Sequence, residues 1–285
     1  MTVMHISMSK FALVSIVLLS VLSLPAQPLH YSTQNAHSHN DYEQAHPFQT
    51  AWHASFGSIE ADIFLVNGKL LVAHSKSELA RNQSLEDLYL KPLLQALKEN
   101  RNFPYADTTL RLQMLIDVKT DSAKTLGALV SLLKKYPALI HSPKLKWVIS
   151  GNRPAAEDFD KYPDFIWFDG ELHKAYSEKA LHRILMLSDN LTRYTQWKGR
   201  NALSEKDSLL LKQIISEAHQ LQKPVRFWDA PDFKEAWETL MHLGVDYINT
   251  DHIEALAMDS GQWTIDNYFH PPPSALYNST FASSC

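Results

Sequence analysis

The chain has 285 residues, of which 45% are hydrophobic and 20% are charged, and its formal net charge is -4. This composition is ordinary for a folded globular protein, and the slight acidity argues against a nucleic-acid partner. The only cysteine is the last residue, Cys285, so no intrachain disulfide can form and the fold must rest on its hydrophobic core.

The first predicted element is a secretory signal peptide over residues 1–26. Residues 11–24 form an uncharged apolar run between Lys10 and Pro25. The run is shorter than the ~20 residues that span a bilayer, and a basic flank with a small residue at Ala26 is typical of a cleavable signal. Cleavage after Ala26 would give a secreted or periplasmic protein. An uncleaved membrane anchor is the alternative.

Eight candidate strands follow, and seven of them precede a helical segment. They are expected at residues 34–38, 57–65, 110–118, 145–150, 165–170, 183–189, 224–228 and 245–251. Such alternation implies parallel strands joined by right-handed crossovers. The chain left after cleavage at Ala26 is close in length to the ~250 residues typical of a (β/α)8 barrel. We therefore predict a single TIM barrel over residues 27–261 and a short tail over 262–285.

An open doubly wound sheet is less favoured, because the chain has only 8 glycines and no G-x-G-x-x-G motif. Between the strands, Ser84 and Ser204 are good N-caps for helices that run to Leu97 and Leu221. Pro92 indicates that the regular part of the first of these helices begins late. A shorter polar helix is expected near residues 171–180.

The second strand carries an isolated acidic pair, Glu60 and Asp62. Side chains two residues apart on a strand point to the same side, so these two project together while Ile59, Ala61 and Ile63 face apolar packing. Neighbouring carboxylates repel one another unless a cation lies between them, and a hard divalent metal suits oxygen ligands. The alternative is the solvent-exposed face of an antiparallel strand.

Other chemically useful residues cluster around this pair. His39 and Asn40 follow the first strand, and the hairpin signal Asn67-Gly68 returns the chain to His74. Asp117 and Lys119 end the third strand, at the same end of a barrel, where catalytic residues gather. Two histidines, an amide and several carboxylates thus meet in one region, which is the inventory of an active site.

These residues carry a resemblance to a known superfamily. The segments are Ser38-His39-Asn40-Asp41-Tyr42, Ile59-Glu60-Ala61-Asp62 and Val72-Ala73-His74. They resemble the superfamily of phosphatidylinositol-specific phospholipase C and glycerophosphodiester phosphodiesterase, and most closely its altered-inheritance-of-mitochondria-type branch. The His-Arg-Gly and Glu-Asn-Thr of typical glycerophosphodiesterases are absent.

The resemblance implies a metal-dependent phosphoric diester hydrolase. It assigns His39 and His74 as acid and base, and Asn40, Glu60, Asp62 and Asp117 as metal ligands. Asp117-Val118-Lys119 resembles the third-strand E-x-K of the glycerophosphodiesterases, with Lys119 facing a phosphate oxygen or, alternatively, paired with Asp117. Four oxygen ligands, one of them an amide, suit Ca²⁺ somewhat better than Mg²⁺.

Two further residues remain open. His37 shares a strand face with His39 and has either a site role or none. Trp228, on a late loop, either forms an apolar wall for a headgroup or packs in the core.

The expected partner is a small phosphodiester or phospholipid headgroup, with possible peripheral membrane contact and a monomeric chain. The rival functions are a metal-binding barrel protein that has lost turnover and a metal-dependent glycoside hydrolase. The glycoside hydrolase needs two facing carboxylates at hydrolase spacing, for which the sequence offers no comparable signature.

Overall fold

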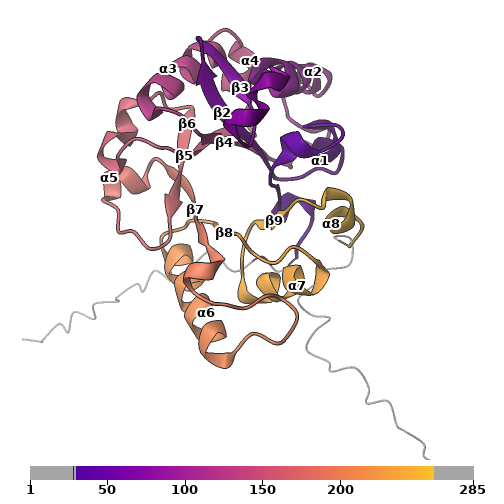
Figure 1. Ribbon diagram of the computed structural model, residues 1–285, viewed down its shortest axis with the longest axis vertical. Coiled ribbons are helices and arrows are strands. Elements are labelled where there is room, and N and C mark those ends of the chain that lie inside the picture. Colours follow the sequence, from indigo (N-terminus) through magenta and orange to yellow (C-terminus); the bar gives the residue numbers. More distant parts are fainter. Residues whose placement is uncertain (1–27, 29, 260–285) are drawn as a thin grey trace, which may run out of the picture.

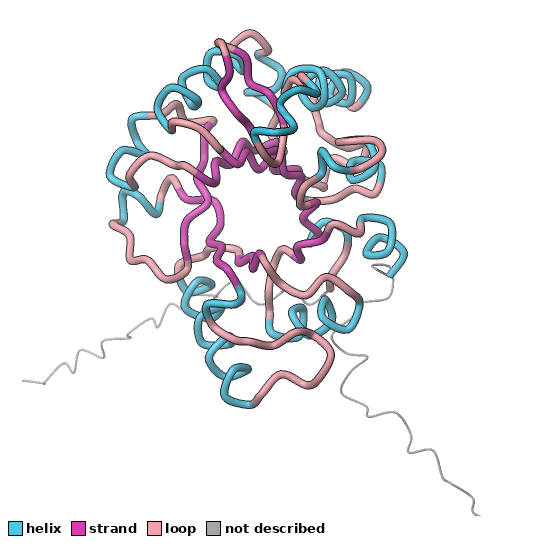
Figure 2. The backbone as a smooth tube through the Cα atoms, viewed as in Figure 1, coloured by secondary structure: helices cyan, strands magenta, loops and turns pink. Residues whose placement is uncertain are grey.

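The computed structural model describes residue 28 and residues 30–259. Its centre is a ring of parallel strands with the helices outside (Figures 1 and 2). The ring strands are β1 (Ala36–Ser38), β2 (Ser58–Val66), β4 (Leu112–Val118), β5 (Leu145–Gly151), β6 (Ile166–Glu171), β7 (Ile184–Asn190), β8 (Val225–Trp228) and β9 (Ile248–Thr250). Spatial neighbours follow chain order, and β1 pairs with both β2 and β9.

The ring closes between β8 and β9 through a short contact. Arg226 and Tyr247 form a single parallel bridge, and the amides of Asp246 and Tyr247 both lie 3.0 Å from the Val225 carbonyl. The eight strands therefore form a nearly closed parallel barrel, which confirms the predicted TIM-barrel architecture. The predicted signal peptide over residues 1–26, the predicted domain end at residue 261 and the C-terminal tail over 262–285 all lie outside the described residues.

A hairpin extends one side of the ring. β3 (Lys69–Val72) pairs antiparallel with the outer half of β2, and Figure 1 shows both strands projecting beyond the barrel. Asn67 and Gly68 have φ values of 48° and 79°. Positive φ at both central positions is what the favoured two-residue hairpin turn requires, so the Asn-Gly prediction is confirmed.

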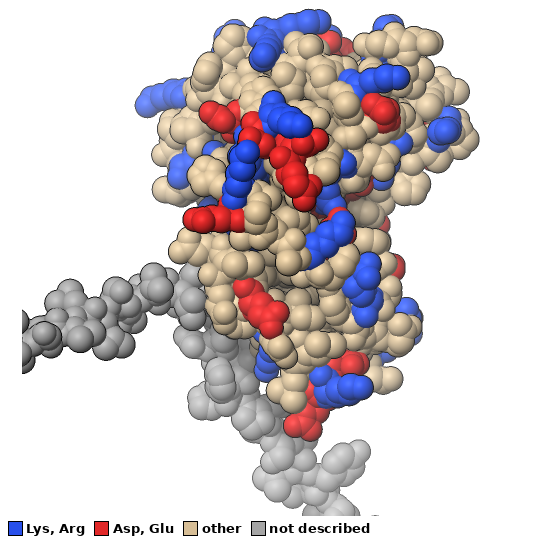
Figure 3. Space-filling model, turned by 90° about the vertical axis from the view of Figure 1, so that its left-hand side faces the viewer, with Lys and Arg blue, Asp and Glu red and all other residues tan. Residues whose placement is uncertain are grey.

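The helices on the outside are α1 (Gln49–His53), α2 (Lys91–Glu99), α3 (Ser122–Leu133), α4 (Pro137–His141), α5 (Glu178–Leu181), α6 (Glu205–Gln220), α7 (Lys234–Leu243) and α8 (Ile253–Asp259). No described helix is long and apolar enough to cross a membrane. Basic and acidic side chains lie interspersed on the face shown in Figure 3, without a broad patch of one sign.

One helix prediction needs correction. The polar helix expected near residues 171–180 is reduced to α5, because β6 runs to Glu171 and Ser177 caps the short helix through the Ala180 amide. The helix expected from Ser84 is confirmed: Ser84 Oγ accepts the Asp87 amide, and regular helix begins only at α2, next to Pro92, after a π-helical turn over Glu86–Leu90. Ser204 likewise caps α6 as predicted, through the Asp207 amide.

The core confirms the predicted facing of β2. Ile59, Ala61 and Ile63 are fully buried in the main apolar cluster, between the sheet and the helices. A second, small cluster of Leu115, Val148 and Met186 fills part of the barrel interior. Glu60 and Asp62 are also buried, at 4% and 1% exposure, so the exposed-strand alternative is wrong.

Candidate active site at the mouth of the barrel

Three carboxylates converge at the end of the barrel where the strands finish, which we call the mouth. Oxygens of Glu60, Asp62 and Asp117 all lie within 4.8 Å of one another. Asp62 and Asp117 are direct neighbours in the pairing of β2 with β4, and inward-facing neighbours on adjacent strands lie side by side. The predicted acidic grouping is therefore present, built from two strands far apart in sequence.

The cluster has the features of a cation site. Asp62 Oδ1 and Asp117 Oδ1 are buried and have no hydrogen-bond partner among the described residues. Burying a carboxylate oxygen without a partner is costly, and hard divalent cations prefer such oxygens. The residues present therefore fit a divalent metal on the grounds of both their charge and these two unpartnered oxygens.

Electrostatics support the same conclusion. Burial, together with the charges of Glu60 and Asp117, raises the pKa of Asp62 to about 8. Burial and the Glu60 charge also raise the pKa of Asp117. Lys119 partly offsets this repulsion, with its Nζ 2.9 Å from Asp62 Oδ2 and 3.0 Å from Asp117 Oδ2. The ion-pair alternative for Lys119 is thus present in the structure, and the same side chain also lines the mouth.

Gly151 makes room for this cluster. Its φ is +68°, and a Cβ added there would lie 1.9 Å from Asp117 Oδ1 and 2.7 Å from the Val118 carbonyl oxygen. We expect Gly151→Ala to displace Asp117, to destabilise the protein by about 1–3 kcal/mol and to weaken metal binding. Thermal unfolding and a calorimetric metal titration measure the two effects.

The matched control is Gly127→Ala in α3, where an added Cβ meets nothing within 4 Å. It should leave metal binding unchanged. Equal metal affinity in the Gly151 and Gly127 variants would contradict the proposed role of Asp117.

His39 lies just past β1 and is held by Asp251. Its Nδ1 is 2.8 Å from Asp251 Oδ1, so the N–H on Nδ1 donates to the carboxylate and Nε2 remains available for proton exchange. Burial lowers the pKa of His39, but the hydrogen bond to Asp251 and the Glu60 charge outweigh it, and the net shift is upward.

Asn40 and His74 are joined to the carboxylates by Tyr42. The Tyr42 hydroxyl lies 2.8 Å from Asn40 Oδ1, 2.9 Å from Asp62 Oδ2 and 3.2 Å from His74 Nδ1. Asn40 has the left-handed backbone conformation (φ 46°) that asparagine tolerates better than most residues. The structure thus brings both predicted histidines, the predicted amide and the predicted carboxylates to one place.

The mouth encloses a cavity of about 400 Å³. Beyond the carboxylates and the two histidines it is lined by Ser150, Arg153, Glu171, Asp189, Arg193 and Trp228. Trp228 is 40% exposed, so it forms part of the cavity wall and does not pack in the core.

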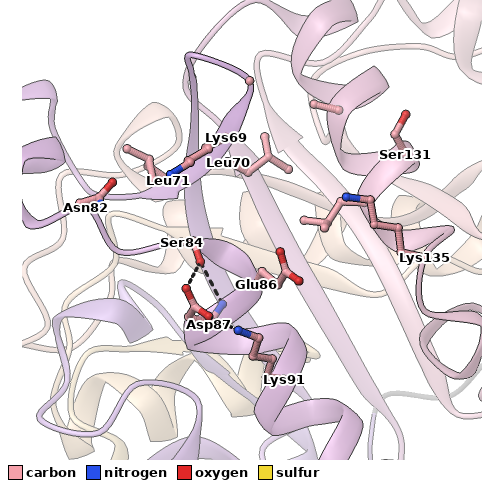
Figure 4. Close-up of a pocket in the computed structure, with 13 residues that line it drawn as sticks. Lys69, Leu70, Leu71, Asn82, Ser84, Glu86, Asp87, Lys91, Ser131 and Lys135 are labelled. Atoms are coloured by element: carbon pink, nitrogen blue, oxygen red, sulfur yellow. Dashed lines mark hydrogen bonds and ion pairs between the residues drawn. The ribbon is translucent and has the colours of Figure 1, made fainter.

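A second hollow of about 500 Å³ lies between the β3 hairpin, α2 and α3 (Figure 4). Figure 4 shows Lys69, Lys91 and Lys135 around it, with Lys91 paired to Asp87. It contains no histidine or grouped carboxylates of the kind that the mouth has. The smaller cavity is therefore the candidate active site.

Several residues of the site were not predicted from the sequence. Tyr42 lies within the matched His-Asn-Asp-Tyr segment, and that adjacency was the available signal. Asp251 is the last residue of the strand expected at 245–251, and that position was its only signal. No sequence pattern pointed to Arg226 as a site residue, although its Nη1 is 3.0 Å from Glu60 Oε2.

Comparisons with known proteins agree with this geometry. Residues 30–138 match the AIM6-like phosphodiesterase domain, and residues 224–254 match the glycerophosphoryl diester phosphodiesterase family. The altered inheritance of mitochondria protein 6 homolog of Arthroderma benhamiae is 26% identical over 255 residues, covering 77% of this chain and 81% of that protein. Altered inheritance of mitochondria protein 6 of Kluyveromyces lactis is 26% identical over 299 residues, covering 78% and 71%.

Among solved structures, a glycerophosphodiester phosphodiesterase from Parabacteroides distasonis superposes with a TM-score of 0.51 at 12% identity. The match covers 83% of this chain and 98% of that chain, and it shows that the two share a fold. The fold, the site and the matched segments together support a relation to the superfamily of phospholipase C-like and glycerophosphodiester phosphodiesterases. Within that superfamily, the family model matched over residues 30–138 and these curated relatives are all of the AIM6-like branch.

Proposed function

We propose that this protein is a divalent-metal-dependent phosphoric diester hydrolase acting on a glycerophosphodiester or phosphoinositide-like substrate. One observation carries the proposal: Asp62 and Asp117, each with one buried, unpartnered oxygen, line the same cavity as His39 and His74. A site with that donor set and two imidazoles suits a reaction in which negative charge grows on oxygen while protons move.

The metal would be held by Glu60, Asp62 and Asp117, with Asn40 at the edge of the group. A bound divalent cation supplies charge neutralisation and polarisation of a phosphoryl oxygen. Ca²⁺ is proposed over Mg²⁺ because the site offers four oxygen ligands, one of them an amide, and Ca²⁺ accepts more protein oxygens in a less regular geometry than Mg²⁺ does.

The chain's own residues would supply the remaining steps. Lys119 lies at the cavity wall and presents a positive charge to a phosphodiester oxygen. His39 has a raised pKa and is held through Nδ1 by Asp251, so it suits the general acid that protonates the leaving oxygen. His74 would then be the general base that accepts the proton of the attacking hydroxyl. Trp228 offers an apolar surface to the headgroup.

The decisive experiment is ³¹P NMR of the purified protein with a mixed set of glycerophosphodiesters and phosphoinositides, first with Ca²⁺ and then with EDTA. Calcium-dependent loss of one diester signal would support the proposal, name the headgroup and reveal whether a cyclic phosphate accumulates. Metal binding without loss of any diester signal would instead favour a binding protein that has lost turnover.

Metal affinity should depend on pH in a defined direction. Because the pKa of Asp62 is about 8 without metal, a cation must displace its proton at neutral pH. We expect apparent affinity to rise from pH 6 to pH 8 by up to about tenfold per pH unit and then to level off. Calorimetry in two buffers of different ionisation enthalpy would show proton release; affinity independent of pH would contradict the arrangement.

The location of the protein, its oligomeric state and its contact with lipid are likewise proposed. A secreted or periplasmic monomer with peripheral access to lipid headgroups fits the apolar run at residues 11–24 and the exposed Trp228. Fractionation of the native protein, together with the mass of the purified protein, tests location and oligomeric state.

A further inference from the structure

A polar layer inside the barrel lies directly beneath the carboxylates. His37, Ser58 and Gln113 occupy adjacent positions on β1, β2 and β4, because His37 pairs with Ser58 and Ser58 pairs with Gln113. All three side chains are buried, at 0%, 0% and 3% exposure. Polar side chains are buried inside a barrel only when their hydrogen bonds are satisfied. The partners of these three side chains therefore indicate what the layer does.

The hydrogen bonds of this layer run in one direction. Gln113 Nε2 donates to Ser58 Oγ at 2.8 Å, and Ser58 Oγ lies 2.6 Å from His37 Nδ1. Among the hydrogen bonds of the described residues, the Ser58 hydroxyl proton has no other acceptor, so it goes to Nδ1. A neutral imidazole then carries its proton on Nε2, which lies 2.7 Å from Glu60 Oε2. The layer therefore ends in a donor aimed at Glu60.

Arg226 of β8, which only β9 separates from β1 in the ring, approaches the same oxygen. Its Nη1 donates to Glu60 Oε2 at 3.0 Å and to Asn249 Oδ1 at 3.3 Å. Nη1 of Arg226 also lies within hydrogen-bond distance of His37 Nε2. Because Arg226 can only donate, a proton on Nε2 leaves Glu60 Oε2 as the acceptor that the two nitrogens share. Burial and the Arg226 charge lower the pKa of His37 to about 3, which agrees with a neutral ring. Both donors thus bind Oε2 of Glu60, and Glu60 also lines the cavity.

We propose that His37 is a positioning residue that, with Arg226, holds one oxygen of Glu60 and so presents the carboxylate to the divalent cation. The inference rests on the proposed metal centre and adds to it the residues that orient one ligand. Groups that hold a metal ligand in place commonly change affinity by about 10–100-fold when they are removed. His37 therefore acts through Glu60 and not on the substrate.

The test is a calorimetric titration of the metal-free protein with Ca²⁺, and in parallel with Mg²⁺ and Mn²⁺. His37→Leu should weaken binding by about 10–100-fold. His37→Gln keeps an N–H donor and should recover part of the loss. The matched control is His219→Leu, which breaks another histidine–carboxylate pair, His219 with Asp246 at 2.7 Å, away from the cavity residues.

A second variant covers the case in which His37→Leu does not fold. Ser58→Ala leaves His37 in place but removes the hydroxyl that fixes its tautomer, and it should weaken binding by about fivefold. Its control is Ser142→Ala, which removes another buried hydroxyl, one that donates to the Asn102 carbonyl. Ring ¹⁵N correlation spectra should show the His37 proton on Nε2 in the wild type and a mixture of tautomers in Ser58→Ala.

The outcomes separate the two proposals. Unchanged metal affinity in His37→Leu, or in Ser58→Ala if the first variant does not fold, would overturn the positioning role and leave the metal centre standing. A wild-type protein that binds none of the three cations would overturn the metal centre, and the positioning role with it. Weakened binding in the site variants but not in their controls would support the role.

Discussion

His74→Ala is expected to lower kcat by about 10²–10⁴-fold, the usual contribution of a general acid or base. The metal affinity should remain nearly intact, because the contacts of the His74 ring are with Tyr42 at 3.2 Å and, more distantly, Asp62 Oδ2 at 3.7 Å. His74 follows β3 and its ring is 60% exposed, so the truncation removes little packing. Steady-state rates on the substrate found by ³¹P NMR would measure the effect.

His53→Ala is the matched control. His53 is an exposed histidine at the end of α1 whose ring bonds to the Gln49 carbonyl, so its loss should leave kcat unchanged. Full activity in His74→Ala would remove His74 from the mechanism. A parallel loss of metal affinity would instead show that His74 supports the metal centre.

The barrel could be predicted because its signals are local. Each ring strand is a short apolar run between turn residues, and the alternation with helices fixes the parallel topology. The expected strands match the observed ones to within a few residues, apart from the shorter β9. The error at residues 171–180 has a local cause as well: the Tyr176 hydroxyl accepts the Glu171 amide, which stabilises a loop where polarity alone favoured a helix.

The acidic pair could be predicted because it depends on strand geometry. Glu60 and Asp62 had to share a face once residues 57–65 were assigned to a strand, and Asp117 had to join them if the strands were parallel neighbours. The pairing of Asp62 with Asp117 is the observed register. The assignment of specific roles came from the resemblance, and this arrangement gives it a spatial basis.

His37 and Arg226 could not be placed from the sequence. β1 ends at Ser38, so His39 leaves the strand and turns toward Asp251, while His37 stays in the barrel against Glu60. The expected shared face of the two histidines therefore does not give them a shared environment. Arg226 is separated from Glu60 by 166 positions in the chain. Contacts of that kind depend on ring closure, which no local pattern encodes.

Asp62→Asn should show separately how the Asp62 carboxylate lowers the stability of the metal-free protein and how it contributes to metal binding. In the wild type without metal, the pKa of Asp62 is about 8 instead of the ordinary 3.8, so the folded state favours the protonated form. The stability that protonated Asp62 contributes to the fold is fully present below pH 3.8 and is lost as the pH rises through about 8. Asparagine carries no such penalty, so the metal-free variant should gain stability relative to wild type by up to about 1.4 kcal/mol per pH unit between these limits.

With Ca²⁺ bound, the wild type should be more stable than Asp62→Asn. Removing one charged ligand is expected to weaken Ca²⁺ binding by about 10²-fold or more, since ligand charge sets affinity at such sites. The rise in Tm that Ca²⁺ gives the wild type should therefore be lost in Asp62→Asn, whereas Asp164→Asn at a fully exposed carboxylate should retain it. Thermal unfolding across pH, with and without Ca²⁺, measures both effects. If the variant is less stable than wild type at pH 8 without metal and equally stabilised by Ca²⁺, Asp62 is a structural ion-pair partner of Lys119 and not a metal ligand.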